Sequence, residues 1–366
     1  MADPEIHEEN ITGVHTLWVD GPPPFRALLG FRVGWADEPL RRHGLTHLVE
    51  HLALSRIGSV PHFYNGGVGL NQAHLMAGGT GEQVGAFLET ACAALADLPL
   101  ERLDTEIGVL QAEDAPRRTS PHAQILADLF GFAGAGVAAL PEYALTWVGP
   151  SEVTAWAASQ FTAGNAVLAL TGPPPPGLRL PLPPGPRRPL AMPPLGPGIP
   201  NRRSQRRRTS EEFAAVGAVG RRSAALVLAG DILRERLFRR LRTDLGLVYQ
   251  VDADYSPLDA DHAFLFAGTA SESRHARRVS TDMLEALDAL TRSGPEAEEI
   301  AQALARLLAW TEEPEELRRA SVLWMRAGQA LLGDPPSTVE SLRAEYAAAG
   351  PDEVRAALAA ALEQGL

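Results

Sequence analysis

The chain contains very little cysteine. Its 366 residues include one, Cys92, which excludes an internal disulfide, so the fold needs no oxidising compartment. The first residues, 1–9, carry acids instead of the basic region that opens a signal peptide, and no later run is apolar for long enough to span a bilayer. We therefore expect a cytoplasmic protein that has no membrane partner.

Positive charge is also in deficit. The chain has 33 Lys and Arg against 45 Asp and Glu, which gives a net charge of −12. This balance argues against nucleic acid as the main partner, so we interpret the arginine-rich stretch 202–208 as a solvated edge of a linker. Because 45% of the residues are hydrophobic, the chain can bury a large core, and its length favours two domains.

Proline and glycine dominate residues 173–200, which predicts an extended linker in polyproline II geometry. We expect a first domain at 1–172, a Pro/Arg-rich linker at 173–208 and a second, related domain at 209–366. The order of elements is similar on both sides, so the expected class is α+β, with two similar domains that each hold a mainly antiparallel sheet with helices on one face. Hydrophobic periodicity predicts strands at 14–19, 27–34, 70–77, 166–171, 211–219, 248–255 and 263–270, and helices at 41–55, 82–98, 100–115, 123–132, 151–161, 224–245, 274–292, 297–310, 317–332, 339–347 and 351–361, with a loop at 60–69.

One short segment carries two histidines four positions apart with a carboxylate between them: His47, Glu50 and His51. On a helix these three side chains share one face, so they can reach one small volume. The neighbouring residues are apolar, which predicts that the segment is buried, and buried ionisable groups need a compensating partner. A divalent metal would be such a partner. We expect five other histidines at the surface: His43, His62, His122, His262 and His275.

The order His-x-x-Glu-His is the inverted form of a zinc-peptidase motif. Neutral imidazoles bind Zn²⁺, and a catalytic zinc has three protein ligands and one position left for water. A carboxylate beside that water can take its proton and pass it to the leaving amine. The two histidines supply two ligands, so a third must come from a later carboxylate or histidine.

The segment resembles the inverted-motif zinc metallopeptidase family of insulinase, pitrilysin and the mitochondrial processing peptidase, in a small bacterial form. In that family the third zinc ligand is a glutamate on a later helix, preceded seven positions earlier by a second glutamate. Glu106 and Glu113 have this spacing. The resemblance therefore implies that Glu113 binds the metal and that Glu106 assists catalysis by orienting a ligand or the water. Since the segment after His51 is shorter than is usual in the family, Glu89 and Asp114 stay open as alternative ligands.

Three more residues follow from the same resemblance. Asn71, after a glycine pair, matches an asparagine of an extended edge segment along which the substrate lies as an added strand. Arg242 and Tyr249 match an Arg/Tyr pair seven positions apart, which binds the substrate backbone and stabilises the tetrahedral intermediate. Gln72 and His74 differ from the residues that usually follow the asparagine, which implies an unusual substrate preference.

The sequence thus predicts a zinc-dependent endopeptidase that acts on peptides or unfolded protein segments. Glu50 would be the general base, and His47, His51 and Glu113 would bind Zn²⁺. Since the chain carries both motifs of one family unit, we expect a homodimer that encloses the site, with a heterodimer containing a related chain as the alternative. Two other functions stay open: a non-catalytic or partner-dependent subunit of a heterodimeric processing peptidase, and a precursor-specific maturation peptidase of a peptide natural-product pathway.

Overall fold

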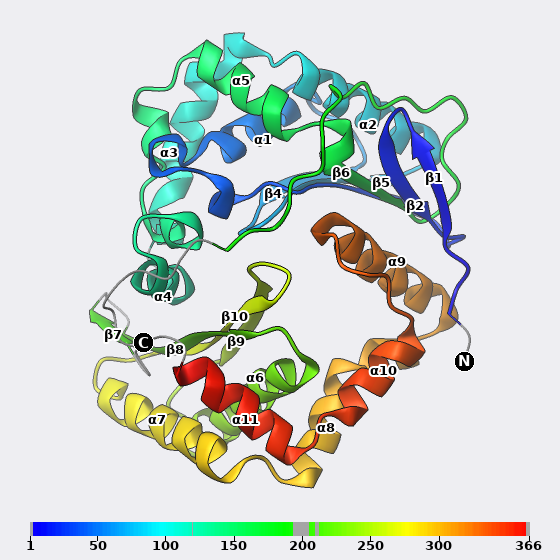
Figure 1. The fold of residues 1–366 in the computed structure, drawn as a ribbon. Helices are drawn as coiled ribbons and strands as arrows, with labels where there is room; N and C mark the ends of the chain where they lie inside the picture. The colour runs from blue at the N-terminus through cyan, green and yellow to red at the C-terminus, as the bar shows by residue number, and fades with distance from the viewer. Residues whose placement is uncertain (1–2, 119, 193–204, 209–211, 364–366) are drawn as a thin grey trace. The chain divides into compact units, whose positions relative to one another are not determined.

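The computed structural model describes residues 3–118, 120–192, 205–208 and 212–363, and among these the side chains of 114–118, 205–208 and 212 are not described. The chain divides into two compact units, each with a sheet and a hydrophobic core of its own (Figure 1). The predicted α+β class is confirmed. Unit 1 consists of Met1–Arg117, Ala133–Leu190 and Trp310–Val339, and unit 2 of Arg118–Phe132, Ala191–Ala309 and Glu340–Leu366.

This division groups the segments differently from the predicted domains 1–172, 173–208 and 209–366. A helix from the first predicted domain lies in unit 2, and residues 310–339 of the second lie in unit 1. The sequence did not predict that these two segments belong to the other unit, because hydrophobic periodicity shows that a helix is buried but not against which sheet it packs. As functional domains, the predicted boundaries stay a prediction.

The sheet of unit 1 has six strands in the order β1-β2-β6-β3-β5-β4. All its neighbouring pairs are antiparallel except β2 and β6, which run parallel. β4 therefore forms one edge of this sheet. The strands are β1 (His7–Ile11), β2 (Val14–Trp18), β3 (Phe25–Phe31), β4 (Phe63–Val68), β5 (Ala73–Gly79) and β6 (Ala166–Leu170).

Helices α1, α2 and α5 cover one face of this sheet, and α9 lies against the opposite face (Figure 1). Strand β6 shows why both faces need cover: Leu168 packs with the first group, whereas Val167 packs with Leu323 of α9. Such a strand is apolar at every position, in contrast to a half-exposed strand. The helices of unit 1 are α1 (Leu45–Ser55), α2 (Gly81–Ala96), α3 (Leu103–Arg118), α5 (Pro150–Gln160) and α9 (Glu315–Leu332), and the 3-10 helices are η1 (Trp35–Asp37), η2 (Leu40–Arg42), η3 (Leu100–Arg102), η4 (Gly134–Ala139), η5 (Tyr143–Thr146), η6 (Ala163–Asn165) and η8 (Ala309–Glu312).

The proline-rich segment 173–190 packs on unit 1 instead of bridging freely. Leu180 is fully buried in the core, and its backbone exchanges hydrogen bonds with the hydroxyl of Thr12. Arg187 donates to the carbonyl of Ala166. Because proline lacks a donor, this segment is anchored by its few remaining N–H groups and by side chains. Of the rest of the predicted linker, residues 193–204 lie outside the described part.

Unit 2 holds a four-stranded antiparallel sheet in the order β7-β8-β10-β9. Helices α6, α7 and α11 pack on one face, and α4 lies on the other, where Ile125 contacts Gly217 of β8 (Figure 1). The strands are β7 (Gln205–Arg208), β8 (Glu212–Arg221), β9 (Asp252–Pro257) and β10 (His262–Ser271), and the helices are α4 (Pro121–Phe130), α6 (Ala224–Leu237), continued by the π-helix η7 (Phe238–Asp244), α7 (Ala276–Ser293), α8 (Ala297–Leu307), α10 (Val339–Ala348) and α11 (Pro351–Glu363).

Several predicted bounds were wrong. The predicted loop 60–69 contains β4, whose glycines weaken the strand signal, although Gly66 is needed for the close approach of this strand to α1. The helix predicted from 41 begins at Leu45, after the 3-10 turn η2. The helix predicted from 151 begins one residue earlier, at Pro150, as α5. Proline at the first helical position is a common start, which explains the shift.

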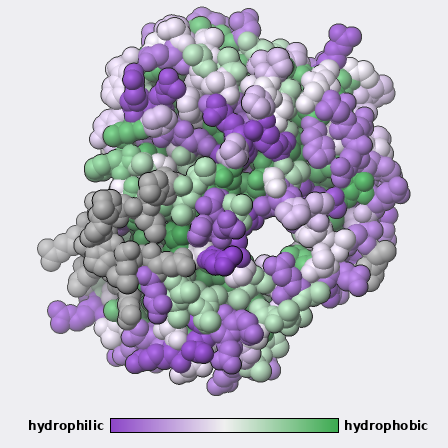
Figure 2. Space-filling view, in the orientation of Figure 1, coloured by the Kyte–Doolittle hydropathy of each residue, from purple (hydrophilic) through white to green (hydrophobic). Residues whose placement is uncertain are grey.

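Within the described ranges no helix is long and apolar enough to cross a membrane. On the face drawn in Figure 2, hydrophilic residues are interspersed with hydrophobic ones. The compartment of the protein stays a prediction.

Candidate metal centre

The N-terminus of α1 is held by a buried carboxylate. Glu38 accepts hydrogen bonds from the backbone N–H groups of Gly44, at 2.9 Å, and Thr46, at 2.7 Å. It also pairs with His43 Nδ1 at 2.9 Å. His43 is buried, so its expected place at the surface was wrong. A carboxylate at this end satisfies donors that have no partner within the helix and interacts favourably with the helix dipole.

α1 presents His47, Glu50 and His51 together, as the spacing predicts. One potential ligand atom from each residue lies within 4.8 Å of the other two, so the three could hold a metal ion. The two imidazole rings meet edge to face at 4.7 Å between centroids. Both Nε2 atoms face the Glu50 carboxylate, at 4.0 Å from His47 and 3.8 Å from His51.

Glu113 reaches the same point from α3. Its Oε2 atom lies 3.9 Å from His47 Nε2 and 3.8 Å from His51 Nε2. Two ligands of a tetrahedral zinc at 2.0–2.1 Å are roughly 3.3 Å apart. The observed separations exceed this by about half an ångström, which small side-chain rotations remove. Two imidazole nitrogens and one carboxylate oxygen are a donor set that zinc accepts, so these residues fit the metal.

The histidine nitrogens that point away from this centre each face a carboxylate. His51 Nδ1 lies 3.5 Å from Glu106 Oε2, which was expected to orient a ligand. His47 Nδ1 lies within hydrogen-bonding distance of Glu142 Oε1, at 3.1 Å. Glu142 was missed by sequence reasoning, because it follows His47 by 95 positions and lies in an irregular segment without a motif.

Glu50 is buried at 4% exposure, and its carboxylate lies over the backbone of β4. A Cβ atom added at Gly66 would come within 2.0 Å of Glu50 Oε1. Only glycine therefore allows the carboxylate to occupy its present position. The edge strand β4 and the candidate base lie in direct contact.

Burial and the neighbouring His47 lower the pKa of His51, although Glu113 and Glu106 oppose this effect. A lowered pKa favours the neutral imidazole, which is the form that binds metals. The lowered pKa of His51 therefore favours cation binding by this residue near neutral pH.

Asn71 lies in the turn between β4 and β5 and is 8% exposed. Its carbonyl oxygen accepts a hydrogen bond of 2.5 Å from the buried guanidinium of Arg32, which also pairs with Asp37. Asn71 was expected within an extended edge segment, but it lies after the edge strand β4 and before β5. Its role toward substrate stays a prediction.

Arg242 and Tyr249, which were matched to the family's Arg/Tyr pair, lie close together in unit 2. The guanidinium carbon of Arg242 is 5.7 Å from the centre of the Tyr249 ring. The hydrogen bond from Leu247 N to Leu241 O closes the intervening turn, and Gly246 adopts a positive φ of 61° there. Tyr249 is 81% exposed, so its hydroxyl is free to meet a ligand from outside.

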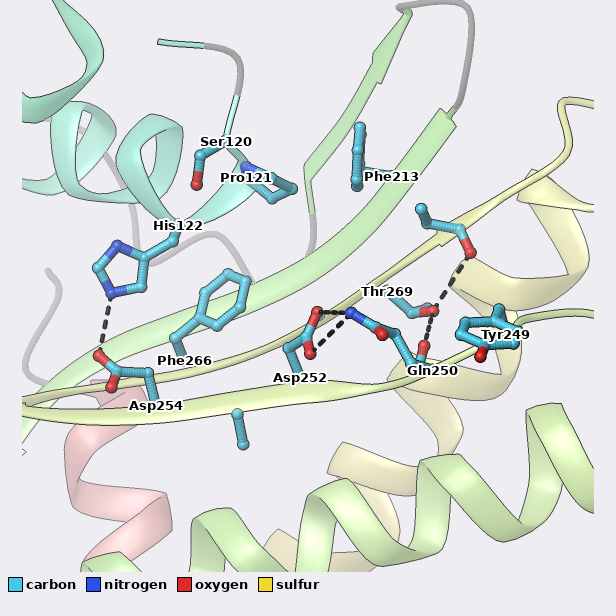
Figure 3. Close-up of a pocket in the computed structure, with 13 residues that line it drawn as sticks. Ser120, Pro121, His122, Phe213, Tyr249, Gln250, Asp252, Asp254, Phe266 and Thr269 are labelled. Atoms are coloured by element: carbon cyan, nitrogen blue, oxygen red, sulfur yellow. Dashed lines mark hydrogen bonds and ion pairs between the residues drawn. The ribbon is translucent and has the colours of Figure 1, made fainter. Parts of the chain in front are cut away.

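Tyr249 also borders a pocket of about 500 Å³ on the sheet of unit 2 (Figure 3). Phe266 and the ion pair between His122 and Asp254, at 3.1 Å, lie in the same pocket. His122, expected as a surface residue without a role, is half-buried there and stacks edge-on against Phe266. Hydrogen bonds from His122 and Ser256 lower the pKa of Asp254 although burial opposes them.

The remaining candidates lie elsewhere. Glu89 is on the exposed side of α2, where it accepts a hydrogen bond from the backbone of Arg179. The side chain of Asp114 lies outside the described residues. His74 packs against Gly67 of the edge strand, and burial lowers its pKa, whereas Gln72 is exposed.

Comparison with known proteins relates this geometry to a family. Residues 148–307 match the family model described as Peptidase M16 inactive domain. The chain is thereby related to the M16 peptidases. The matched region begins after every candidate metal ligand, so the word inactive describes a part of the chain that does not contain them. No curated protein matches the chain.

Solved structures share the fold of the whole chain. A peptidase M16 inactive domain from Pseudomonas fluorescens gives a TM-score of 0.74 at 15% identity, covering 97% of this chain and 95% of that one. A protease from Helicobacter pylori gives 0.72 at 13% identity, with 97% and 96% covered. The periplasmic protease PqqL from Escherichia coli gives 0.69 at 12% identity, and it covers all of this chain with 47% of its own length. Identities this low establish the fold alone.

Proposed function

We propose that this chain is a zinc-dependent endopeptidase. The observation that carries the proposal is the convergence of His47 Nε2, His51 Nε2 and Glu113 Oε2 beside the Glu50 carboxylate. The relation to the M16 peptidases supports it. These three atoms would hold the ion, which supplies Lewis acidity to a water molecule and to the scissile carbonyl.

Glu50 performs the proton transfers. Its carboxylate lies within 4.0 Å of both ligand nitrogens, so it can accept a proton from the attacking water and deliver it to the leaving amine. Burial keeps this carboxylate from being solvated by bulk water, which strengthens its interaction with a nearby positive charge.

The substrate is a peptide in an extended conformation. β4 is an edge strand, and an added peptide strand would satisfy its backbone donors and acceptors. Since Glu50 contacts Gly66 of this strand, a peptide bound along β4 would pass the catalytic centre. An unfolded segment can adopt this conformation, whereas a folded surface cannot.

Arg242 and Tyr249 would complete the site by donating to the carbonyl oxygen as it becomes negatively charged. We propose that they act on the zinc site of a second copy in a homodimer. The proposal rests on the presence of both motifs in one chain.

Glu50→Gln tests the proposal. Gln keeps the size of the side chain but cannot accept a proton, so we expect cleavage of an unstructured peptide library to fall by roughly 10²–10⁴-fold. The zinc content of the purified variant, measured by elemental mass spectrometry, should stay near one ion per chain. Unchanged cleavage by Glu50→Gln, or a wild-type protein without zinc, would rule out this function.

A second candidate is a partner-dependent subunit without activity of its own. The description of residues 148–307 as an inactive domain is compatible with it. In that case the wild-type chain would bind zinc or peptide but would cleave nothing until a related chain was added. Cleavage by the isolated wild-type protein excludes this candidate.

A further inference from the structure

We infer that Glu142 is a positioning residue of the metal centre, which orients His47 for metal binding. The inference rests on the proposed zinc function and adds a residue that neither the inverted motif nor the Glu106/Glu113 spacing includes.

The contact between Glu142 and His47 is buried and short. Glu142 Oε1 lies 3.1 Å from His47 Nδ1, and the two side chains are 2% and 9% exposed. An ionised carboxylate can only accept a hydrogen bond, so Nδ1 must carry the proton. The lone pair of the neutral ring then lies on Nε2, the atom that faces Glu50 and Glu113.

The backbone holds Glu142 in this position. Glu142 directly precedes η5, and the N–H of Ala144 in that helix donates to the carbonyl of His43 at 3.1 Å. Ala144 and Leu145 are buried in the core of unit 1. A Cβ added at Gly44, the N-cap of α1, would lie 2.7 Å from Glu142 Cβ. Only glycine at the start of α1 allows Glu142 to approach this closely.

Glu142 has a counterpart on the other ligand. Glu106 faces Nδ1 of His51 at 3.5 Å and is itself held by two hydrogen bonds from Arg102, at 3.2 and 2.8 Å. Each histidine therefore has a carboxylate behind it and presents Nε2 to the same point. Such a carboxylate fixes the ring and raises the basicity of the ligand nitrogen, and its removal weakens metal binding by roughly 10–100-fold.

The test measures zinc affinity of the full chain by competition with a chromophoric chelator, which requires no activity. Glu142→Gln keeps the hydrogen bond through its amide oxygen but loses the charge, and Glu142→Ala loses both. We expect binding to weaken in the order wild type, Gln, Ala, with the Ala variant roughly 10–100-fold weaker. Glu82→Gln, an exposed glutamate in the first turn of α2, is the charge-matched control and should bind as the wild type does.

A double-mutant cycle separates positioning from general destabilisation. If Glu142 acts through His47, Glu142→Gln should cost little further affinity in a His47→Ala chain but should keep its full effect in a His51→Ala chain. Thermal unfolding of the metal-free Gln variant should match that of the wild type, since the isosteric side chain preserves packing.

Two results overturn the inference while leaving the proposed function intact: wild-type zinc affinity in both Glu142 variants, or an equal loss in the His47→Ala and His51→Ala chains. A wild-type chain that binds no zinc overturns the proposed function and the inference together. The two failures are therefore distinguishable in one experiment.

Discussion

Two glycines, which have only a hydrogen atom in place of a side chain, set the geometry of the candidate centre. Gly66 leaves room for the Glu50 carboxylate, and Gly44 leaves room for Glu142. In both cases the neighbouring atom belongs to a side chain to which we assign a role in the proposed zinc site. A methyl group at either position would displace a functional group while leaving the zinc motif intact.

Gly66→Ala should therefore uncouple metal binding from catalysis. The added Cβ would overlap Glu50 Oε1, which must rotate away, so we expect peptide cleavage to fall by roughly 10²-fold or more. Zinc content should stay near that of the wild type, because Gly66 contributes no ligand. Gly81→Ala is the control: its Cβ would meet nothing within 4 Å, and cleavage should be unchanged. Equal cleavage by Gly66→Ala and wild type would contradict this position of Glu50.

Among the secondary-structure elements, α1 is fixed at several points. Glu38 caps its N-terminus, Trp156 of α5 donates to the hydroxyl of Thr46 at 3.1 Å, and Leu48 and Leu52 are fully buried. A helix held at its start and along its apolar side keeps its two histidines in a constant relation. The Arg/Tyr pair, in contrast, lies at the exposed end of a π-helix and can adjust to a ligand.

In unit 2, an ion pair joins helix α6 to helix α8. Arg236 binds both carboxylate oxygens of Glu299, at 2.7 and 2.6 Å. The hydrogen bonds from Arg236 hold the pKa of Glu299 below its ordinary value of 4.5. A carboxyl whose pKa is lower in the folded state stabilises the fold above the unfolded pKa, and this contribution is lost as the pH falls through the folded pKa.

We expect Glu299→Gln to lower the free energy of unfolding at pH 7 by roughly 0.2–1 kcal/mol, since the pair is partly exposed to solvent. The difference in the free energy of unfolding between variant and wild type should shrink as the pH falls below 4.5, because the wild-type carboxyl then becomes protonated and loses its charge. Urea denaturation at several pH values measures this. Glu298→Gln, a neighbour on the same helix that contacts Gln302, is the control and should show no such pH dependence. A constant difference across pH would contradict the assigned cause.

At the scale of the whole molecule, the chain carries a zinc motif in one unit and an Arg/Tyr pair in the other. In a homodimer, the Arg/Tyr pair of each copy would reach the zinc motif of the other copy. This arrangement predicts that two inactive variants can complement each other when they exchange chains.

Mixing Glu50→Gln and Arg242→Ala chains tests this. Each homodimer should be inactive, whereas a mixed dimer has one zinc site with an intact base and an intact Arg/Tyr pair from its partner. At equal mixing we expect about a quarter of the wild-type activity. A mixture of Glu50→Gln with the Glu50→Gln/Arg242→Ala double variant contains no intact base and should stay inactive. Confirmed chain exchange without recovery of cleavage would contradict the dimer.

The sequence by itself determined the α+β class and the core of the metal motif, because both follow from local spacing: residues three and four apart share a helix face wherever the helix lies. Tertiary structure alone decided that Glu142 lies behind His47, that Glu38 and His43 form a buried pair under α1, and that α9 and the segment 173–190 belong to unit 1. It also decided that the predicted loop 60–69 contains the edge strand β4. These features depend on contacts between residues far apart in the chain, which periodicity and motif spacing do not encode.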